Sequence, residues 1–253
     1  MWSTSLLLVL TSSAFGALAA PASASSNMTR ALEHRETVIN SGTSEGSGTI
    51  DGLTWQATGV LSQGCTESTI VNCYSLFLSS DPTAQLDPGF PSSPRQRDEF
   101  HFPTLALGAS FSYTWKQYLY ASTGTGTSFF HLMQLFDDTA GDPVVTLDAV
   151  SGTVAIRDYV RGDGEASCGA AACPTTDIAN YHGTTTTHTI SGKTGPSGSV
   201  TYKVTRDDNG LEVISYSATG KMGTGVGYVK LGIYRAAFEG MTTANAVVGD
   251  WTD

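Results

Sequence analysis

The sequence contains few charged residues, and few basic residues in particular. Charged side chains make up 14% of its 253 residues, and 13 Lys and Arg stand against 23 Asp and Glu, which gives a formal net charge of −10. An average soluble protein has roughly 25% charged residues. The shortage of Lys and Arg argues against broad nucleic-acid binding, because that binding depends on neutralising phosphates.

Helical periodicity is also nearly absent. Residues 28–38 are the one weak candidate, and the residues that build coiled coils are too few. Short alternating runs such as 199–206 and 211–218 flank turn residues instead, here Asp-Asp-Asn-Gly at 207–210. Residues 81–94 carry four of the nine prolines and are a predicted loop. With 40% hydrophobic residues for a core, these features predict an all-β domain, a β-jelly-roll sandwich of two antiparallel sheets.

No segment is apolar for the roughly 20 residues that a membrane-spanning helix needs. Residues 5–20 hold a short apolar run followed by small residues and an Ala-Leu-Ala cleavage site, although no Lys or Arg precedes them. We therefore expect a signal peptide at 1–20, a single domain at 21–253, and secretion without attachment to a membrane. Asn27 begins an Asn-Met-Thr sequon and is a predicted glycosylation site.

The chain has four cysteines, which lie in two close pairs: Cys65 with Cys73, and Cys168 with Cys173. In a secreted protein they indicate disulfides, for which three pairings are possible. Local pairing within each of the two pairs would close two loops. A zinc site is the alternative, but neither spacing is the usual Cys-x₂-Cys.

Three short segments carry most of the side chains suited to chemistry, and the first is RQRDEFH at 95–101. Side chains of a strand alternate between its faces, so Arg95, Arg97, Glu99 and His101 share one face. Four ionisable groups in a row do not form a core. They form either a solvated outer face or the floor of a polar binding groove.

The second segment, at 129–136, is apolar except for His131 and Gln134. Their odd spacing puts them on opposite faces of a regular strand, and a β-bulge would bring them to one face. Alternatively, each is an ordinary hydrogen-bonded residue of the interior.

The third segment, at 228–235, alternates polar and apolar residues. Tyr228, Lys230, Gly232 and Tyr234 share one face, and the apolar residues between them are expected to pack between the two sheets. The glycine leaves room for a ligand to approach the backbone.

These three segments, which read RQRDEFHF, HLMQLF and YVKLGIYRA, resemble in that order the motif strands of jelly-roll polysaccharide lyases. The alginate-lyase strands run R-x-E-x-R, Q-[IV]-H and Y-F-K-x-G-x-Y, and the glucuronan lyases are similar in plan. The third motif is in full register from Tyr228 to Tyr234. His101 stands where alginate lyases have Arg, and His131 precedes Gln134 where they have a later His, which favours another uronate polymer. The resemblance covers most of the mature chain and implies a concanavalin A-like fold.

The resemblance implies an enzyme that cleaves a polymer containing uronic acid by β-elimination. Such a lyase removes the proton at C5 and expels the sugar linked through O4, after it has neutralised the neighbouring carboxylate. It therefore needs a base and an acid. The motifs imply Tyr234 for proton transfer, with either His101 or His131 as the second group. Gln134 and Arg97 would hold the carboxylate.

The other polar residues of the three strands would bind the substrate or adjust the site: Arg95, Glu99, Tyr228 and Lys230. A tyrosine has an ordinary pKa of about 10, so a role as base needs nearby positive charge, which Lys230 and Arg97 would supply. Glu99 would orient Arg97 through a charge-assisted hydrogen bond. The implied partner is an acidic polysaccharide, and we expect a monomer that requires no cofactor.

Two other functions fit the same predicted architecture. A glycoside hydrolase needs two carboxylates that flank the bond it cleaves, and Glu99 and Glu212 are available on strands without a spacing that marks them as a pair. A non-catalytic lectin would use exposed aromatic platforms, for which Trp115, Tyr118 and Tyr120 are candidates unless they belong to the core. A product that absorbs in the ultraviolet separates the lyase from both.

Two further groups of residues could bind metal ions. Asp137, Asp138 and Asp142 form an acidic segment that is either a structural calcium site or a solvated turn. His182 and His188 flank a run of threonines and are either metal ligands or solvent-exposed loop residues.

Overall fold

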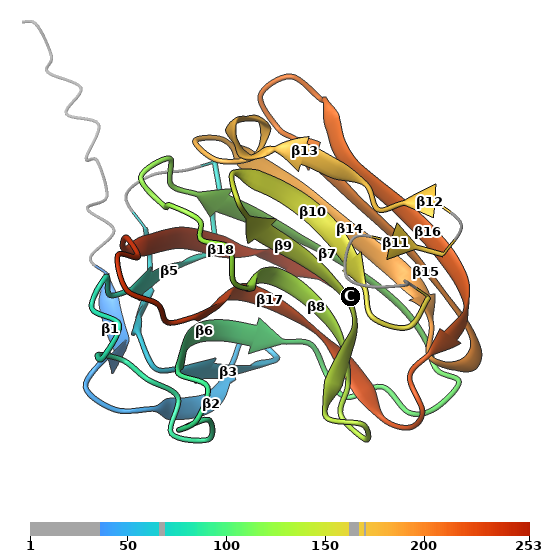
Figure 1. Cartoon of the computed structure of the whole chain (residues 1–253), viewed down its shortest axis with the longest axis horizontal. Coiled ribbons are helices and arrows are strands. Elements are labelled where there is room, and N and C mark those ends of the chain that lie inside the picture. The colour runs from blue at the N-terminus through green and yellow to red at the C-terminus, as the bar shows by residue number, and fades with distance from the viewer. Residues whose placement is uncertain (1–35, 66–68, 162–166, 170) are drawn as a thin grey trace, which may run out of the picture. The chain divides into compact units, whose positions relative to one another are not determined.

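The computed structural model describes residues 36–65, 69–161, 167–169 and 171–253. Within these ranges nearly every regular element is a strand, and the strands form two large antiparallel sheets that make the two layers of a sandwich (Figure 1). The predicted signal peptide and Asn27 lie outside the described residues.

The first sheet has eight strands. In spatial order they are β1 (Thr37–Ser41), β4 (Val60–Gln63), β5 (Cys73–Leu78), β18 (Ala244–Thr252), β7 (Ser110–Leu119), β14 (Thr185–Lys193), β15 (Gly195–Arg206) and β16 (Glu212–Met222).

The second sheet also has eight strands, in the order β13 (Thr175–Asp177), β10 (Thr153–Asp158), β9 (Asp142–Val150), β8 (Phe130–Asp137), β17 (Gly227–Ala236), β6 (Arg95–His101), β3 (Leu53–Ala57) and β2 (Gly46–Ile50). A two-stranded ribbon of β11 (Ser167–Cys168) and β12 (Ala171–Ala172) and the short 3₁₀ helix η1 (Ile178–Asn180) complete the described elements. Neighbours such as β6 and β17 are far apart in sequence, as the crossing connections of a jelly roll require. The predicted fold class is confirmed.

The core lies between the two sheets and is built from the inward-facing residue of each alternating pair. In β17 these residues are Val229, Leu231 and Ile233, each at most 1% exposed, so the predicted apolar face is confirmed. In β7 one of the inward-facing residues is Trp115, which is fully buried and stacks on His188 with 4.8 Å between ring centroids. Trp115 is therefore a core residue and not a platform for a sugar.

Local predictions hold in the strands and turns and fail at the one helix candidate. The turn at 207–210 joins β15 to β16 as a hairpin, and residues 81–94 form an irregular connection between β5 and β6, as predicted. The helix expected at 28–38 is wrong for the part that the structure describes, because Thr37 and Val38 pair with β4. Both residues are β-branched, which favours a strand.

The four cysteines form the two local disulfides, Cys65–Cys73 and Cys168–Cys173. Their Cα atoms are 5.9 and 4.9 Å apart, within the range that a disulfide requires. Local pairing is confirmed, and the zinc alternative is wrong because all four sulfur atoms are used. None of the helical segments in the described residues has the length and hydrophobicity to cross a membrane.

Candidate active site

The three strands that carry the predicted chemistry lie side by side in the second sheet, with β17 between β6 and β8 (Figure 1). Tyr234 pairs with Arg97 on one side, and Lys230 pairs with both His101 and Gln134. Directly paired residues of an antiparallel ladder point to the same face. The sheet therefore gathers these side chains on the face turned away from the core.

A β-bulge brings the second segment into line with the other two. The register of β17 on β8 shifts between Leu231 and Tyr234, and the register of β8 on β9 shifts between His131 and Met133. As a result His131 pairs with Tyr234, while Gln134 remains on the same face three residues later. Of the two alternatives for this segment, the β-bulge is confirmed.

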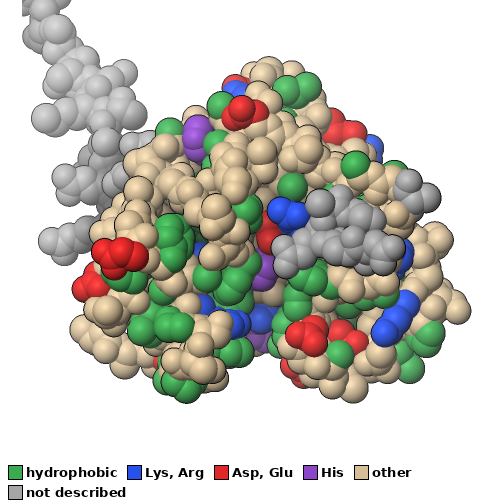
Figure 2. Space-filling model, in the orientation of Figure 1, with side chains coloured by type: hydrophobic (Ala, Val, Ile, Leu, Met, Phe, Trp, Pro, Cys, Tyr) green, Lys and Arg blue, Asp and Glu red, His purple; other side chains and the backbone are tan. Residues whose placement is uncertain are grey.

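The gathered side chains line a groove of about 590 Å³. Figure 2 shows a hollow in the middle of this face, with Lys or Arg and His side chains inside it. Of the nine predicted catalytic and substrate-binding residues, seven line the groove: Arg95, Arg97, His131, Gln134, Tyr228, Lys230 and Tyr234. The first segment is thus the floor of a groove and not a solvated outer face.

Tyr234 lies among cationic and aromatic neighbours in this groove. Its hydroxyl accepts hydrogen bonds from Arg95 Nη1 at 3.0 Å and from Arg97 Nη2 at 3.4 Å. Burial raises the pKa of Tyr234, and the positive charge of the two arginines opposes that rise. The hydroxyl is therefore protonated at neutral pH and able to donate a proton.

The connection between β5 and β6 adds two residues that sequence analysis missed, one that lines the groove and one that binds Arg97 beneath it. Asp87 is buried and forms an ion pair with Arg97, whose Nη1 also donates to Gln56 on β3 at 3.0 Å. The ring of Phe90 lies 3.9 Å from the guanidinium carbon of Arg95. A proline-rich connection has no periodicity from which the direction of its side chains could be predicted.

Glu99 lies at the centre of a buried group of charges. Its Oε1 accepts a 2.6 Å hydrogen bond from Gln134 Nε2, and its Oε2 lies 3.9 Å from both Arg97 Nη1 and Lys230 Nζ. Burial lowers the pKa of Lys230, while the carboxylate of Glu99 opposes that shift. In this arrangement Glu99 orients both cations, and the amide nitrogen of Gln134 is bound to Glu99.

His131 is held by a carboxylate that sequence analysis also missed. Its Nδ1 lies 2.6 Å from Oδ1 of Asp148, which is the residue directly opposite on β9, and both are buried. Because a carboxylate accepts the proton of Nδ1, the other ring nitrogen is left as a proton acceptor beside the groove. An acidic residue in the interior of the mostly apolar strand β9 was the available signal.

The two candidates for the second proton-transfer group occupy different places. The ring of His131 lies 5.8 Å from the ring of Tyr234, measured between centroids. His101 lies at the other end of β6, where it stacks on Tyr228 at 4.6 Å and does not line the groove. Burial and the charge of Lys230 lower the pKa of His101. The arrangement favours His131.

The structure explains the glycine at position 232 by the packing of two strands, whereas the sequence suggested room for a ligand. A Cβ atom there would lie 2.3 Å from the carbonyl oxygen of Asp98 and 3.0 Å from Cα of Glu99, and the residue has a φ of +133°. Close packing of β17 against β6 therefore requires a glycine at this position.

The residues proposed for the hydrolase and lectin alternatives do not come together. Glu212 is exposed on β16 of the first sheet and pairs with Lys203 at 2.9 Å, whereas Glu99 belongs to the second sheet. Tyr118 and Tyr120 are half-buried, contact each other edge to face at 5.0 Å, and pack on the buried cluster that contains the first disulfide.

The acidic segment is organised by its own turn. The carboxylate of Asp137 is 4% exposed and accepts hydrogen bonds from the backbone of Thr139, Ala140 and Thr224 and from the Thr224 hydroxyl. Asp138 accepts from the hydroxyl of Tyr228 at 3.1 Å. Across the described ranges, no three His, Cys, Asp or Glu side chains are grouped as metal ligands.

His188 is neither exposed nor in a loop, which corrects the sequence-based expectation. It belongs to β14 and is fully buried, with hydrogen bonds to the hydroxyls of Tyr181, Thr186 and Tyr202 at 3.1, 3.0 and 2.7 Å. Burial lowers its pKa to about 3. The alternating run of threonines around it is a strand with one face inside the core.

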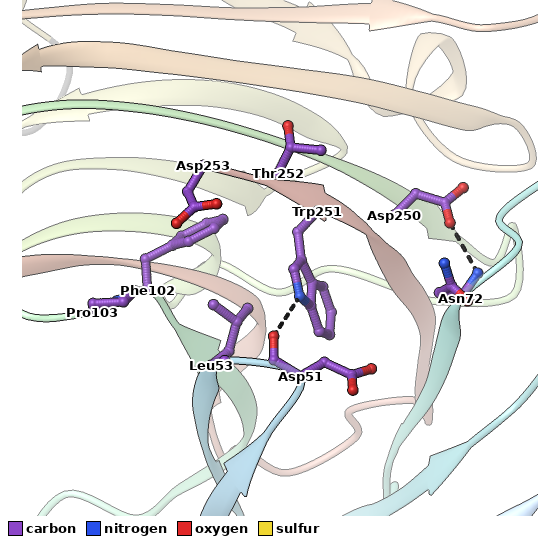
Figure 3. Close-up of a pocket in the computed structure, with 10 residues that line it drawn as sticks. Asp51, Leu53, Asn72, Phe102, Pro103, Asp250, Trp251, Thr252 and Asp253 are labelled. Carbon is purple, nitrogen blue, oxygen red and sulfur yellow. Dashed lines mark hydrogen bonds between the residues drawn. The ribbon is translucent and has the colours of Figure 1, made fainter.

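A second hollow, of about 480 Å³, has lining residues that are already bonded to one another (Figure 3). Trp251 Nε1 donates to the carbonyl of Asp51, whose carboxylate accepts from the hydroxyl of Tyr74 at 2.5 Å. Asp250 accepts from the backbone nitrogen of Asn72 at 2.9 Å. Both carboxylates connect parts of the fold, so the groove on β6, β8 and β17 is the better candidate for chemistry.

No protein-family model and no curated protein sequence matches the chain. Among solved structures, it is similar to the endo-β-1,4-glucuronan lyase of the fungus Trichoderma reesei, with a TM-score of 0.53 and 12% identity over 85% of this chain and 92% of that one. An alginate lyase from Corynebacterium sp. matches with a TM-score of 0.48 and 12% identity over 71% and 75% of the two chains. The lectin UEA-II, complexed with galactose, matches with a TM-score of 0.48 and 11% identity over 83% and 94%.

The likeness to the glucuronan lyase establishes the concanavalin A-like jelly-roll fold of this chain. A polysaccharide lyase is therefore among the solved structures that share its fold. Since unrelated functions share such folds, the function has to be argued from the groove.

Proposed function

We propose that this protein is a secreted polysaccharide lyase that cleaves a polymer containing uronic acid by β-elimination, with glucuronan-like and alginate-like chains as the first substrates to test. The observation that carries the proposal is the pairing of Tyr234 with His131 on one face of the groove, with two arginines on the tyrosine hydroxyl and Asp148 on the histidine.

The two proton-transfer groups have complementary states. His131 offers its second ring nitrogen to the C5 proton, because Nδ1 is bound to Asp148. The C5–H electrons form the C4=C5 double bond as the bond between C4 and O4 breaks. Tyr234, protonated because burial raises its pKa, donates its proton to the departing O4. His131 then releases the C5 proton to water, and Tyr234 takes up a proton from water, which restores both groups.

The carboxylate at C5 must be neutralised for that proton to become acidic enough. Arg95 projects its guanidinium beside the hydroxyl of Tyr234 and supplies a positive charge at this point. Arg97, which the resemblance implies for this task, reaches the same hydroxyl at 3.4 Å, whereas the amide nitrogen of Gln134 is bound to Glu99. No metal ion is required in this scheme, and the enzyme acts as a monomer.

Secretion belongs to the same proposal. The predicted signal peptide at 1–20 supports it, and so do the two disulfides, which persist in oxidising compartments.

The test is to incubate the purified protein with glucuronan and alginate and to follow the absorbance of the unsaturated uronate. A lyase gives one new absorbing end for each new reducing end. New reducing ends without absorbance would identify a hydrolase, and binding without either signal would identify a lectin; both results contradict the proposal.

A further inference from the structure

The charges at the floor of the groove largely compensate one another. Arg97 forms an ion pair with Asp87, and both Arg97 and Lys230 lie 3.9 Å from Glu99. All four residues are at most 7% exposed. Two cations therefore face two carboxylates, and this buried group offers a bound polymer little net charge.

Arg95 differs, because all the partners found for it are neutral. Its guanidinium donates to the carbonyl and hydroxyl of Ser93 at 2.9 and 2.6 Å and to the hydroxyl of Tyr234 at 3.0 Å. The rings of Phe90 and Phe129 lie 3.9 and 5.3 Å from its guanidinium carbon. No carboxylate among the described residues lies within 4 Å of it. It is a positioned cation whose charge is available to a substrate carboxylate.

Two exposed carboxylates line the other end of the same groove. Asp138 and Asp142 are exposed, and neither forms an ion pair within the part of the chain that the structure describes. Asp138 is bonded to Tyr228, which lies six residues from Tyr234 along β17, a separation of roughly 20 Å in a strand. The groove therefore changes from positive at Arg95 to negative at its far end.

We propose that the preferred substrate is a heteropolysaccharide in which uronate residues are separated by neutral sugars. This inference rests on the proposed lyase function. One uronate carboxylate binds beside Arg95 and Tyr234, and the sugars beside Asp138 and Asp142 carry no charge. A homopolyuronate would place further carboxylates near those two, where like charges repel. The net charge of −10 adds a long-range repulsion of any densely charged polyanion.

Cellulose oxidised at C6 provides a matched pair of probes with one backbone. Full oxidation gives a homopolyglucuronate, and partial oxidation gives glucuronates isolated between glucose residues. We expect the wild-type protein to cleave the partly oxidised polymer several-fold more efficiently per glucuronate at low ionic strength. Added salt should narrow the difference, because it screens charges in the open groove. Binding of both polymers is measured separately by affinity electrophoresis.

The variant Asp138→Asn/Asp142→Asn tests which residues produce the preference. Since exposed charge interactions are weak, we expect its efficiency on the fully oxidised polymer to rise about two- to fivefold relative to its efficiency on the partly oxidised one. The matched control is Glu45→Gln/Glu239→Gln, which removes two exposed carboxylates outside the groove and changes net charge equally. It should leave the ratio between the polymers unchanged.

The inference is overturned if the fully oxidised polymer is bound and cleaved at least as well per glucuronate as the partly oxidised one. An equal rise in the control variant would also overturn it, because the effect would then come from net charge and not from the groove. If neither polymer yields an unsaturated product, the proposed function fails, and tighter binding of the partly oxidised polymer would still support the inference about charge.

Discussion

Two buried histidines of this protein have the same ring and different surroundings. His131, beside the groove, has a carboxylate on one ring nitrogen, Asp148, and its second nitrogen is available. His188, between the sheets, has hydroxyls on both nitrogens, among them those of Tyr181 and Tyr202. A ring enclosed by neutral partners keeps one protonation state and holds the fold, whereas a ring with one carboxylate and one open side can exchange protons with a substrate.

The largest expected effect is a loss of turnover, and it distinguishes the tyrosine beside His131 from the tyrosine beside His188. Tyr234→Phe removes the hydroxyl between the two arginines, and turnover should fall by roughly 10²–10⁴-fold, as for a lost general acid. Steady-state kinetics on the accepted polymer measures it. Tyr202→Phe, which removes the hydroxyl that contacts His188, is the matched control and should lower the melting temperature with kcat retained. Near-normal turnover in Tyr234→Phe would remove that residue from the mechanism.

The next effect concerns the carboxylate that distinguishes the two histidines. In Asp148→Asn the amide can donate to Nδ1 of His131, which moves the ring proton to the nitrogen that faces the groove. We expect kcat to fall by roughly 10²-fold or more while polymer binding is kept. Nitrogen NMR of the ring reports the change of tautomer directly. A variant that changes KM alone, with the tautomer preserved, would refute the role given to Asp148.

Substitution of His188 should lower stability and leave turnover unchanged. His188→Leu leaves the hydroxyls of Tyr181 and Tyr202 without their partner in the core, and should lower the free energy of unfolding by about 2–4 kcal/mol. Chemical denaturation measures this loss. Because His188 lies outside the groove, the folded variant should keep wild-type kcat; a large loss of kcat at full folding would mean that the two histidine sites are coupled.

The smallest effect is a dependence of stability on pH. Burial lowers the pKa of His188 to about 3 in the folded protein, against an ordinary value of about 6.5 in the unfolded chain. Below pH 6.5 the unfolded chain takes up a proton that the folded protein refuses, so stability falls as the pH drops from 6.5 towards 3. At pH 5.5 the free energy of unfolding should be lower by about 1.4 kcal/mol than well above pH 6.5 because of His188.

Melting curves of the wild type and His188→Leu between pH 7.5 and 5 would isolate this contribution. The gap between the two melting temperatures should narrow as the pH falls, since the variant lacks the group that titrates. A constant gap would show that His188 is already able to charge in the folded state.

The fold and the three chemical strands were predictable because their signals are local. Alternation along 228–235 separates the apolar residues of the core from Tyr234 and its neighbours, and a hairpin turn at 207–210 can be identified from four residues. The spacing of His131 and Gln134 also indicated a bulge as one of two alternatives, and the structure has it. Each of these predictions needs only a few consecutive residues.

The partners of those residues were not predictable in the same way. Asp148 reaches His131 only because of the register between two strands, and Asp87 reaches Arg97 through the course of an irregular connection. His188 was misjudged as an exposed loop residue because a run of threonines has no apolar pattern, although threonine is well suited to strands. Contacts between distant segments depend on packing that a single sequence does not display.

The connection at 81–94 is a suitable region for redesign of the groove. It is attached to β6 from behind, where Gln96 binds three of the carbonyls in and before it, and its front delivers Asp87 and Phe90 to the two arginines. The segment is therefore a defined region in which substitutions can be concentrated. A library confined to it would vary the charge and the aromatic support of Arg95 and Arg97 together, while every strand of the sandwich kept its own sequence.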